Sequence, residues 1–251
     1  MSEKNKITAA AFMWIWPEFS MTIPGDFILG VILALQAGPS ENFTPLGTTL
    51  ASMTGLLFAT SLFCLYKSYT AHSILSPYVI GTYRLIATIF CSSLAFKNGI
   101  PPHAVLAGII LGTYSASISR IGQERFRQTI RKLGIFAWWP TILAGIVGIS
   151  CVVRNFAFYG ATAPAWMSGY MGVWLLFRTF YISNAVKGWC TPSRLFQADG
   201  LLVRGMIPLQ AAVFMLFATS QPWNAIAAAI LAMILSTFQT IACKLLPTPE
   251  F

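Results

Sequence analysis

Apolar residues occur along the chain in long runs, which are separated by short segments rich in Pro, Gly and charged residues. A transmembrane helix needs about 20 consecutive residues of mainly apolar character. The runs therefore predict eight membrane-spanning helices, most of them bounded by Pro or Gly. The predicted spans are residues 22–38, 45–66, 77–96, 101–118, 135–153, 163–183, 205–220 and 223–245.

The pattern predicts an all-α fold, a polytopic transmembrane helix bundle of about eight spans. We expect residues 1–251 to form one integral membrane domain. Residues 1–21 form a cytoplasmic or interfacial segment in this prediction, because Trp14 and Trp16 suit the headgroup region, and residues 22–245 form the bundle. No fixed-period repeat or soluble domain interrupts the pattern.

The composition strengthens the membrane interpretation. Hydrophobic residues make up 56% of the 251 positions and charged residues only 9%, whereas a soluble domain carries about 25% charged residues. So few charges are insufficient to cover the surface of a soluble fold of this size. The composition therefore excludes a soluble enzyme, a disordered chain and a coiled coil.

Cations are distributed unevenly over the predicted loops. With the N-terminus inside, twelve Lys and Arg residues fall in inner segments, whereas only Lys97 and Arg154 fall in outer loops. This bias predicts that both termini are cytoplasmic, in a bacterial inner membrane or an equivalent one. The inner cations are Lys4, Lys6, Lys67, Arg120, Arg125, Arg127, Arg131, Lys132, Lys187, Arg194, Arg204 and Lys244.

Two inner segments, residues 119–134 and 184–205, are long enough for short amphipathic surface helices. The first contains Arg120, Arg125 and Arg127, which are candidates for binding lipid headgroups. We expect membrane lipids as partners, with anionic lipid or an acidic protein at the cytoplasmic face. The net charge of +9 is also typical of nucleic-acid binding, which we do not expect in so apolar a chain.

Two arginines lie inside predicted spans, where ionisable residues are candidates for function. Arg84 is suited to bind a phosphate, a carboxylate or a carbonyl group. The alternative is that its side chain extends to the membrane boundary. Arg178 lies near the end of its span, so we expect extension there, with binding of a ligand or headgroup as the alternative.

Three acidic residues are the candidates for chemistry. Asp26 either caps the first predicted span or pairs with a cation such as Arg84. Glu124 and Asp199 have arginine neighbours along the chain, and we expect local salt bridges for both. If the chain is an enzyme that works without a metal, the same three acids are the candidate proton donors.

Several motifs carry a resemblance to a known family. They are Pro24-Gly25-Asp26, Leu65–His72, Gly81–Arg84, Thr113–Glu124 and Arg204–Ala211. Together they resemble the UbiA superfamily of membrane prenyltransferases, especially its EboC-like branch, over most of the chain. The resemblance implies a shortened prenyltransferase-like bundle with an affinity for isoprenoids, and a ligand-binding role for Tyr66 and Lys67.

The chain departs from this family in its acidic residues. Family enzymes hold Mg²⁺ with two Asp-rich motifs, and the metal binds the prenyl diphosphate. No Asp or Glu occurs between Glu41 and Glu124, and Glu124 is the only acid in residues 119–134. We therefore expect neither Mg²⁺ nor metal-assisted prenyl transfer, and we predict no metal site.

The sequence thus favours a non-catalytic pseudoenzyme. We expect a structural subunit of a larger membrane complex, or a component that binds an isoprenoid, a quinone, a carotenoid or a chlorophyll-type pigment. One alternative is a membrane-embedded isoprenoid enzyme, either a prenyltransferase or a metal-free terpene cyclase. Another is a transporter, which has less support because no paired repeats are evident.

Overall fold

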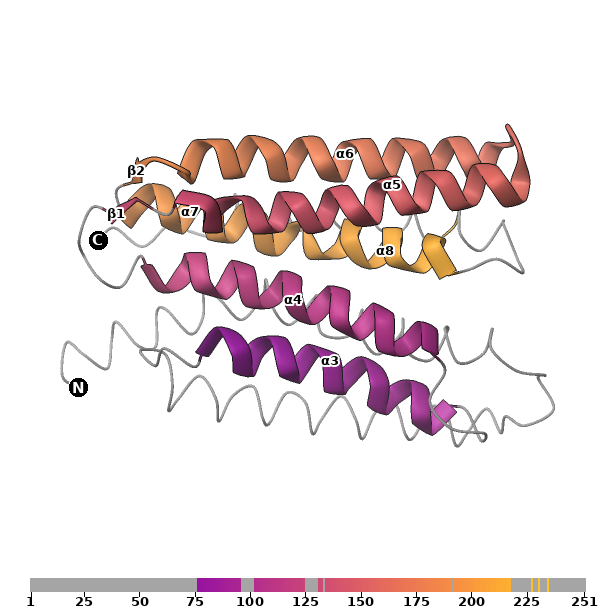
Figure 1. The fold of residues 1–251 in the computed structure, drawn as a ribbon, viewed down its shortest axis with the longest axis horizontal. Helices are drawn as coiled ribbons and strands as arrows, with labels where there is room; N and C mark the ends of the chain where they lie inside the picture. Colours follow the sequence, from indigo (N-terminus) through magenta and orange to yellow (C-terminus); the bar gives the residue numbers. More distant parts are fainter. Residues whose placement is uncertain are drawn as a thin grey trace.

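The computed structural model describes residues 76–95, 102–124, 131–132, 134–190 and 192–217, with the single positions 227, 230 and 234. Helices dominate this part of the chain, as predicted (Figure 1). The short 3₁₀ helix η3 (Gly134–Trp138) precedes α5. The α-helices are α3 (Ser76–Ala95), α4 (Pro102–Glu124), α5 (Trp139–Tyr159), α6 (Ala163–Val186), α7 (Pro192–Arg204) and α8 (Met206–Phe217).

Each of these α-helices has a proline in its first turn. Proline is favoured there because its missing N–H has no partner in a first turn and its fixed φ suits a helix. The predicted role of proline as a boundary marker is therefore confirmed in the described part of the chain. The prolines are Pro77, Pro102, Pro140, Pro164, Pro192 and Pro208.

Helices α3 and α4 form one antiparallel hairpin, and α5 and α6 form another (Figure 1). In each hairpin, a pair of glycines allows the backbones of the two helices to approach closely. A Cβ on Gly81 would lie 2.7 Å from the carbonyl oxygen of Gly112. One on Gly172 would lie 3.0 Å from the carbonyl oxygen of Gly148. Such close backbone approach is typical of small residues at helix contacts in membranes.

Helices α7 and α8 form a rod that is interrupted at Gly205 and packs against both hairpins (Figure 1). Pro208 explains the interruption, because in a continuous helix its ring would clash with the carbonyl group of Arg204. The N–H of Gly205 donates to Leu202 O at 2.9 Å, and the N–H of Leu209 donates to Gly205 O at 3.1 Å. All 12 residues of α8 are buried, so α8 is central to the described helices.

A two-stranded antiparallel ladder joins the two basic segments at one end of the bundle. It consists of β1 (Arg131–Lys132) and β2 (Trp189–Cys190), in which Arg131 is opposite Cys190 and Lys132 is opposite Trp189. The structure therefore agrees with the prediction that both segments lie on one side. That this side is cytoplasmic stays a prediction.

The outer face of α5 is apolar and exposed. Its large exposed side chains recur every three or four residues, and the opposite face, which includes Ala144, Val147 and Cys151, is buried against the bundle. In a bilayer this stripe faces lipid chains. The 21 residues of α5 span about 30 Å, which matches the hydrocarbon thickness. The exposed stripe is Trp139, Ile142, Ile146, Ile149 and Val153.

Aromatic side chains mark both ends of the α5–α6 hairpin. At the ladder end, Nζ of Lys187 lies 5.7 Å from the centroid of the Trp138 ring. At the other end, the rings of Phe156 and Trp166 meet edge-on with their centroids 5.3 Å apart. Tryptophan and lysine in these places are typical of membrane–water boundaries.

Three stretches of the described chain are long and apolar enough to cross a membrane. They are Pro102–Ile121, Trp139–Tyr159 and Gly200–Phe217, of which the last runs through the interruption at Gly205. With the lipid-facing stripe, they identify the chain as a membrane protein. Within the described residues, the structure thus supports three spans, and a total of eight stays a prediction. Predicted spans 22–38 and 45–66 lie outside the described residues, as does nearly all of 223–245.

The predicted bounds need correction at two helices. Helix α4 continues beyond position 118 to Glu124, and α5 runs from Trp139 to Tyr159 instead of over residues 135–153. Arg154 therefore lies inside α5 and not in a loop, because the apolar run resumes at Phe156 and continues through Phe158.

A helix does form in the second basic segment, where an amphipathic surface helix was predicted. This helix is α7, which packs against α4 and α6 and buries Leu195 and Leu202. Its apolar face is therefore covered by protein. In the first basic segment, the described residues up to Glu124 continue α4.

Candidate functional site

Helix α3 carries a row of polar side chains on its buried face, which we call the α3 polar stripe. Arg84, Thr88 and Ser92 follow one another at intervals of four residues, and only 1%, 0% and 0% of their surfaces are exposed. Residues four apart lie on the same side of a helix. A buried cation in a membrane helix is costly and typically marks a binding site or a transport path.

The hydroxyl groups of the stripe differ in their hydrogen bonding. Oγ1 of Thr88 donates to the backbone oxygen of Arg84 at 3.0 Å, so it is satisfied within its own helix. The buried Oγ of Ser92 has no hydrogen-bond partner among the described residues. A buried hydroxyl group costs free energy until it meets a partner. The stripe thus combines a cation and an unsatisfied hydroxyl group, whose Cα atoms lie about 12 Å apart along the axis.

The contact between α3 and α4 fixes the direction of this stripe. Gly81 lies one turn before Arg84 and touches the backbone of Gly112. One turn earlier in α4, a Cβ on Gly108 would lie 3.1 Å from the backbone oxygen of Leu85. Because backbone meets backbone at both levels, α3 cannot turn about its axis without a clash. Arg84 is therefore held on one face.

The second arginine that falls inside a predicted span lies in the other hairpin. Nη2 of Arg178 on α6 donates to the backbone oxygen of Leu201 on α7 at 3.2 Å. Its Cζ lies 5.4 Å from the centroid of the Trp174 ring, one turn earlier in α6. A carbonyl group of α7 therefore holds the guanidinium group. The extension of Arg178 to the membrane boundary stays a prediction.

Tyr114 on α4 meets the same end of α7. The tyrosine side chain is fully buried, and its hydroxyl group donates to the backbone oxygen of Leu202 at 3.2 Å. The last carbonyl groups of a helix lack partners within that helix. Tyr114 and Arg178 therefore supply side-chain donors to successive carbonyl groups, those of Leu202 and Leu201, where α7 ends.

The predicted binding residues fall into two groups. Arg84 and Arg178 are described and belong to different hairpins, and Arg120 is half-buried near the end of α4. The structure therefore does not join Arg84 and Arg178 in one site. The other predicted residues, Asp26, Tyr66, Lys67, Arg125 and Arg127, lie outside the described residues.

The two remaining candidate acids lie on helices. Glu124 is the last residue of α4, and Asp199 lies within α7. Position 199 shares the face of α7 on which Leu195 and Leu202 are buried. The local salt bridges expected for Glu124 and Asp199 stay predictions.

Within the described residues, no group of three or more His, Cys, Asp or Glu side chains is arranged to hold a metal ion. The described histidine, His103, stacks its ring on Phe217 with the centroids 5.2 Å apart. This contact joins the start of α4 to the end of α8. The donors of the α3 polar stripe, a guanidinium and a hydroxyl group, suit a carbonyl or acidic group of a ligand.

Sequence reasoning did not select several residues that the structure brings into these sites. Thr88 and Ser92 could have been found from their spacing relative to Arg84, because polar residues at intervals of four in an apolar run lie on one helix face. The break at Gly205 could have been found from Pro208, which follows three residues later and cannot lie within a continuous helix. Nothing in the sequence indicated a role for Tyr114, because its hydrogen-bond partner, Leu202 O, lies in a distant part of the chain.

Comparison with models of known families, with curated proteins and with solved structures finds no match to this chain. The prenyltransferase resemblance therefore rests on the sequence motifs alone.

Proposed function

We propose that this protein is a non-catalytic membrane component that binds a long-chain amphiphile, of isoprenoid, quinone or pigment type, inside its helix bundle. The observation that carries the proposal is the α3 polar stripe. Arg84, with 1% of its surface exposed, and Ser92, with none, supply polar donors within an apolar bundle. The family resemblance supports the same ligand class, and a shortened prenyltransferase-like bundle of eight spans stays part of the proposal.

The chemistry of the stripe favours a ligand with a polar head and an apolar tail. A guanidinium group donates strong hydrogen bonds to carbonyl, carboxylate or phosphate oxygens. The serine hydroxyl group accepts or donates a second hydrogen bond further along α3. Binding sites of this kind are mostly apolar and use a few polar groups to orient the ligand. The stripe supplies a few such polar groups within an apolar helix.

The proposal is tested by identifying what copurifies with the protein. The full chain is purified from its source membrane in mild detergent, and bound molecules are extracted and identified by mass spectrometry and absorption. We expect an isoprenoid, quinone or pigment in near-stoichiometric amount. Arg84→Gln should remove most of it, and Ser92→Ala should reduce it, because each variant removes one donor to the ligand head.

Arg154→Gln is the matched control, because Arg154 is also an intrahelical arginine but lies on α5, over the ring of Phe158. Its ligand content should equal that of the unmodified protein. Folding of each variant is checked by thermal unfolding. If folded Arg84→Gln keeps the full ligand content, or if no amphiphile copurifies with the unmodified protein, the proposal fails.

A separate experiment tests whether the protein is a subunit of a larger membrane complex. Gently solubilised membranes are separated by size under native conditions, and the 27.5 kDa chain is located by antibody together with the absorbing fractions. We expect migration within a large complex. Migration of the chain alone, with a ligand bound, would favour the solitary isoprenoid enzyme over the subunit.

A further inference from the structure

The lipid-facing stripe of α5 continues beyond the start of that helix, toward the β1–β2 ladder. Trp139, the first residue of α5, belongs to the stripe and is 46% exposed. Ile135, which lies just before it in η3, is 73% exposed. Tryptophan is typical of the boundary between the hydrocarbon region and the headgroups. The ladder end of the stripe is therefore the place where lipid chains give way to lipid heads.

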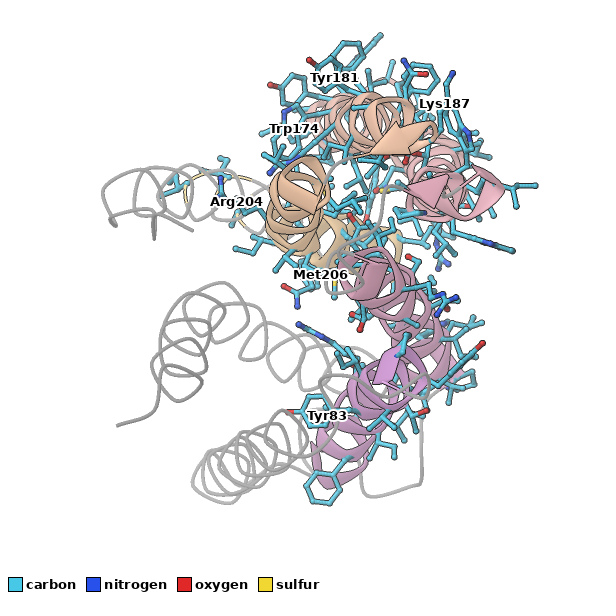
Figure 2. The ribbon with its side chains drawn as sticks, turned by 90° about the vertical axis from the view of Figure 1, so that its left-hand side faces the viewer. Tyr83, Trp174, Tyr181, Lys187, Arg204 and Met206 are labelled. Atoms are coloured by element: carbon cyan, nitrogen blue, oxygen red, sulfur yellow. The ribbon has the colours of Figure 1, made fainter. Side chains whose placement is uncertain are left out.

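Lys187, the residue after α6, is fixed beside this boundary by two contacts. Its backbone oxygen accepts from the N–H of Gly134 at 3.3 Å, and its Nζ lies 5.7 Å from the centroid of the Trp138 ring. Trp138 in turn meets the ring of Phe180, with the centroids 5.4 Å apart. Figure 2, which faces the ladder end, shows Lys187 and Trp174 on opposite sides of α6. Lys187 is thus an exposed cation in a defined place next to the start of α5.

The ladder end carries an excess of positive charge. The pairing of β1 with β2, continued by the hydrogen bond to Lys187 O, brings the backbone of Arg131 and Lys132 alongside the segment that follows α6. No Asp or Glu occurs between Glu124 and Asp199, so the α5–α6 hairpin has no acid to balance these cations. Cations gathered at a membrane boundary attract anionic lipid heads.

We propose that Lys187 binds the phosphate head of an anionic phospholipid whose acyl chains lie along the α5 stripe. An ammonium group donates charge-assisted hydrogen bonds to phosphate oxygens, and Arg131 and Lys132 add to the positive field. The exposed Ile135 and Trp139 favour a lipid over an acidic protein segment, because they continue a surface that faces lipid chains. The site is separate from the α3 polar stripe and does not depend on the ligand proposed there.

The site is tested in the full chain with the photoreactive residue benzoylphenylalanine in place of Ile135. The protein is placed in nanodiscs of phosphatidylcholine with a minor share of phosphatidylglycerol and irradiated, and the attached lipid is identified by mass spectrometry. We expect phosphatidylglycerol to be enriched among the adducts over its share of the nanodisc. Lys187→Gln should lower this enrichment about fivefold, which is typical for loss of one cation near an anionic membrane surface.

Further variants separate headgroup binding from a structural role of Lys187. Lys187→Arg keeps the charge and should keep the enrichment. Added salt should reduce the enrichment more strongly in the unmodified protein than in Lys187→Gln, because salt screens exposed charges. Arg154→Gln is the matched control, since it removes a cation that lies over the ring of Phe158 near the other end of α5. It should leave the enrichment at position 135 unchanged, and thermal unfolding checks that each variant is folded.

Three results would overturn the proposal. The first is undiminished enrichment of phosphatidylglycerol in folded Lys187→Gln, and the second is an equal loss in Arg154→Gln. The third comes from irradiation in the source membrane. Attachment of position 135 to a protein instead of a lipid would show that a partner subunit covers this surface, whereas attachment to an anionic phospholipid would support the site.

Discussion

The hydroxyl group of Tyr114 donates a hydrogen bond to the backbone oxygen of Leu202, which lies 88 positions further along the chain. This bond, 3.2 Å long, joins the middle of α4 to the last turn of α7. The adjacent Gly205 leaves space for it, because a Cβ there would lie 2.7 Å from the tyrosine oxygen. The interruption between α7 and α8 is therefore held by a side chain from another hairpin.

Replacing Tyr114 with Phe tests this contact. We expect the free energy of unfolding to fall by about 0.5–1.5 kcal/mol, which is typical for loss of one hydrogen bond. The lower part of this range is favoured, since Leu202 O also accepts from the N–H of Gly205. Unfolding by denaturant in mixed micelles gives the value. Tyr170→Phe, at an exposed position, should have no effect, and an equal fall in both would contradict the assignment.

Gly205→Ala should destabilise the protein by about 1–3 kcal/mol, because the added methyl group is forced against Tyr114 and Leu202 O. Gly188→Ala is the control, since a Cβ there meets nothing within 4 Å. In the double variant Gly205→Ala/Tyr114→Phe the clash is partly relieved. The two effects should therefore not add in a double-mutant cycle, and full additivity would show that the contact does not exist.

Gly112→Ala should separate α3 from α4. A Cβ on Gly112 would lie 2.6 Å from the backbone oxygen of Gly81, and helix backbone cannot move locally to make room. We expect a loss of about 1–3 kcal/mol in unfolding free energy and weaker ligand retention at the α3 polar stripe. Gly169→Ala, with its nearest neighbour 4.0 Å away, should be neutral or slightly stabilising. An unchanged stability of Gly112→Ala would refute the close approach.

The α5–α6 hairpin is joined by a buried hydrogen bond of 2.7 Å, from Oγ1 of Thr141 to Oγ of Ser183. Thr141→Val keeps the shape and removes the donor, so we expect a loss of about 0.6–1.7 kcal/mol. The comparison is Thr113→Val, because Thr113 is exposed and bonds only to Ile109 O in its own helix. Chemical denaturation in bicelles measures both. A larger effect at Thr113 than at Thr141 would contradict the prediction.

The orientation of α6 is testable by labelling. In a background without native cysteines, Thr162→Cys and Lys187→Cys lie at opposite ends of α6, at exposed positions. A membrane-impermeant maleimide should label each from one side only, and from opposite sides. The cation distribution predicts that position 187 is labelled from the cytoplasm. Labelling of both positions from one side would exclude α6 as a membrane-spanning helix.

The helices of the described residues were largely predictable from the sequence, because apolar runs and prolines close together in the chain determine where a helix lies. Apolar runs with proline in the first turn located α3, α4, α5 and α6, although the ends of α4 and α5 were placed too early. The end of α5 was missed because Arg154 was expected to stop it, whereas a helix tolerates an arginine that reaches over the ring of Phe158. The interruption at Gly205 was a predicted boundary for the same local reason, the proline that follows.

The candidate sites were predictable only in part. Arg84 and Arg178 were identified from their places in apolar runs, since an intramembrane cation is conspicuous in a sequence. Their surroundings depend on tertiary contacts that no spacing reveals. The hydrogen bond from Arg178 to Leu201 O arises because α7 returns alongside α6.

The burial of α8 on every side constrains how the protein is made. Helices α3 to α6 leave the ribosome before α8, yet α8 ends in contact with members of both hairpins. The glycine contacts of Gly81 with Gly112 and of Gly148 with Gly172 lie within single hairpins, so each hairpin can assemble in the membrane as soon as its second helix arrives. The two hairpins already touch through α4 and α5, but their packing is complete only when translation delivers α8, which contacts α4 of one hairpin and both helices of the other.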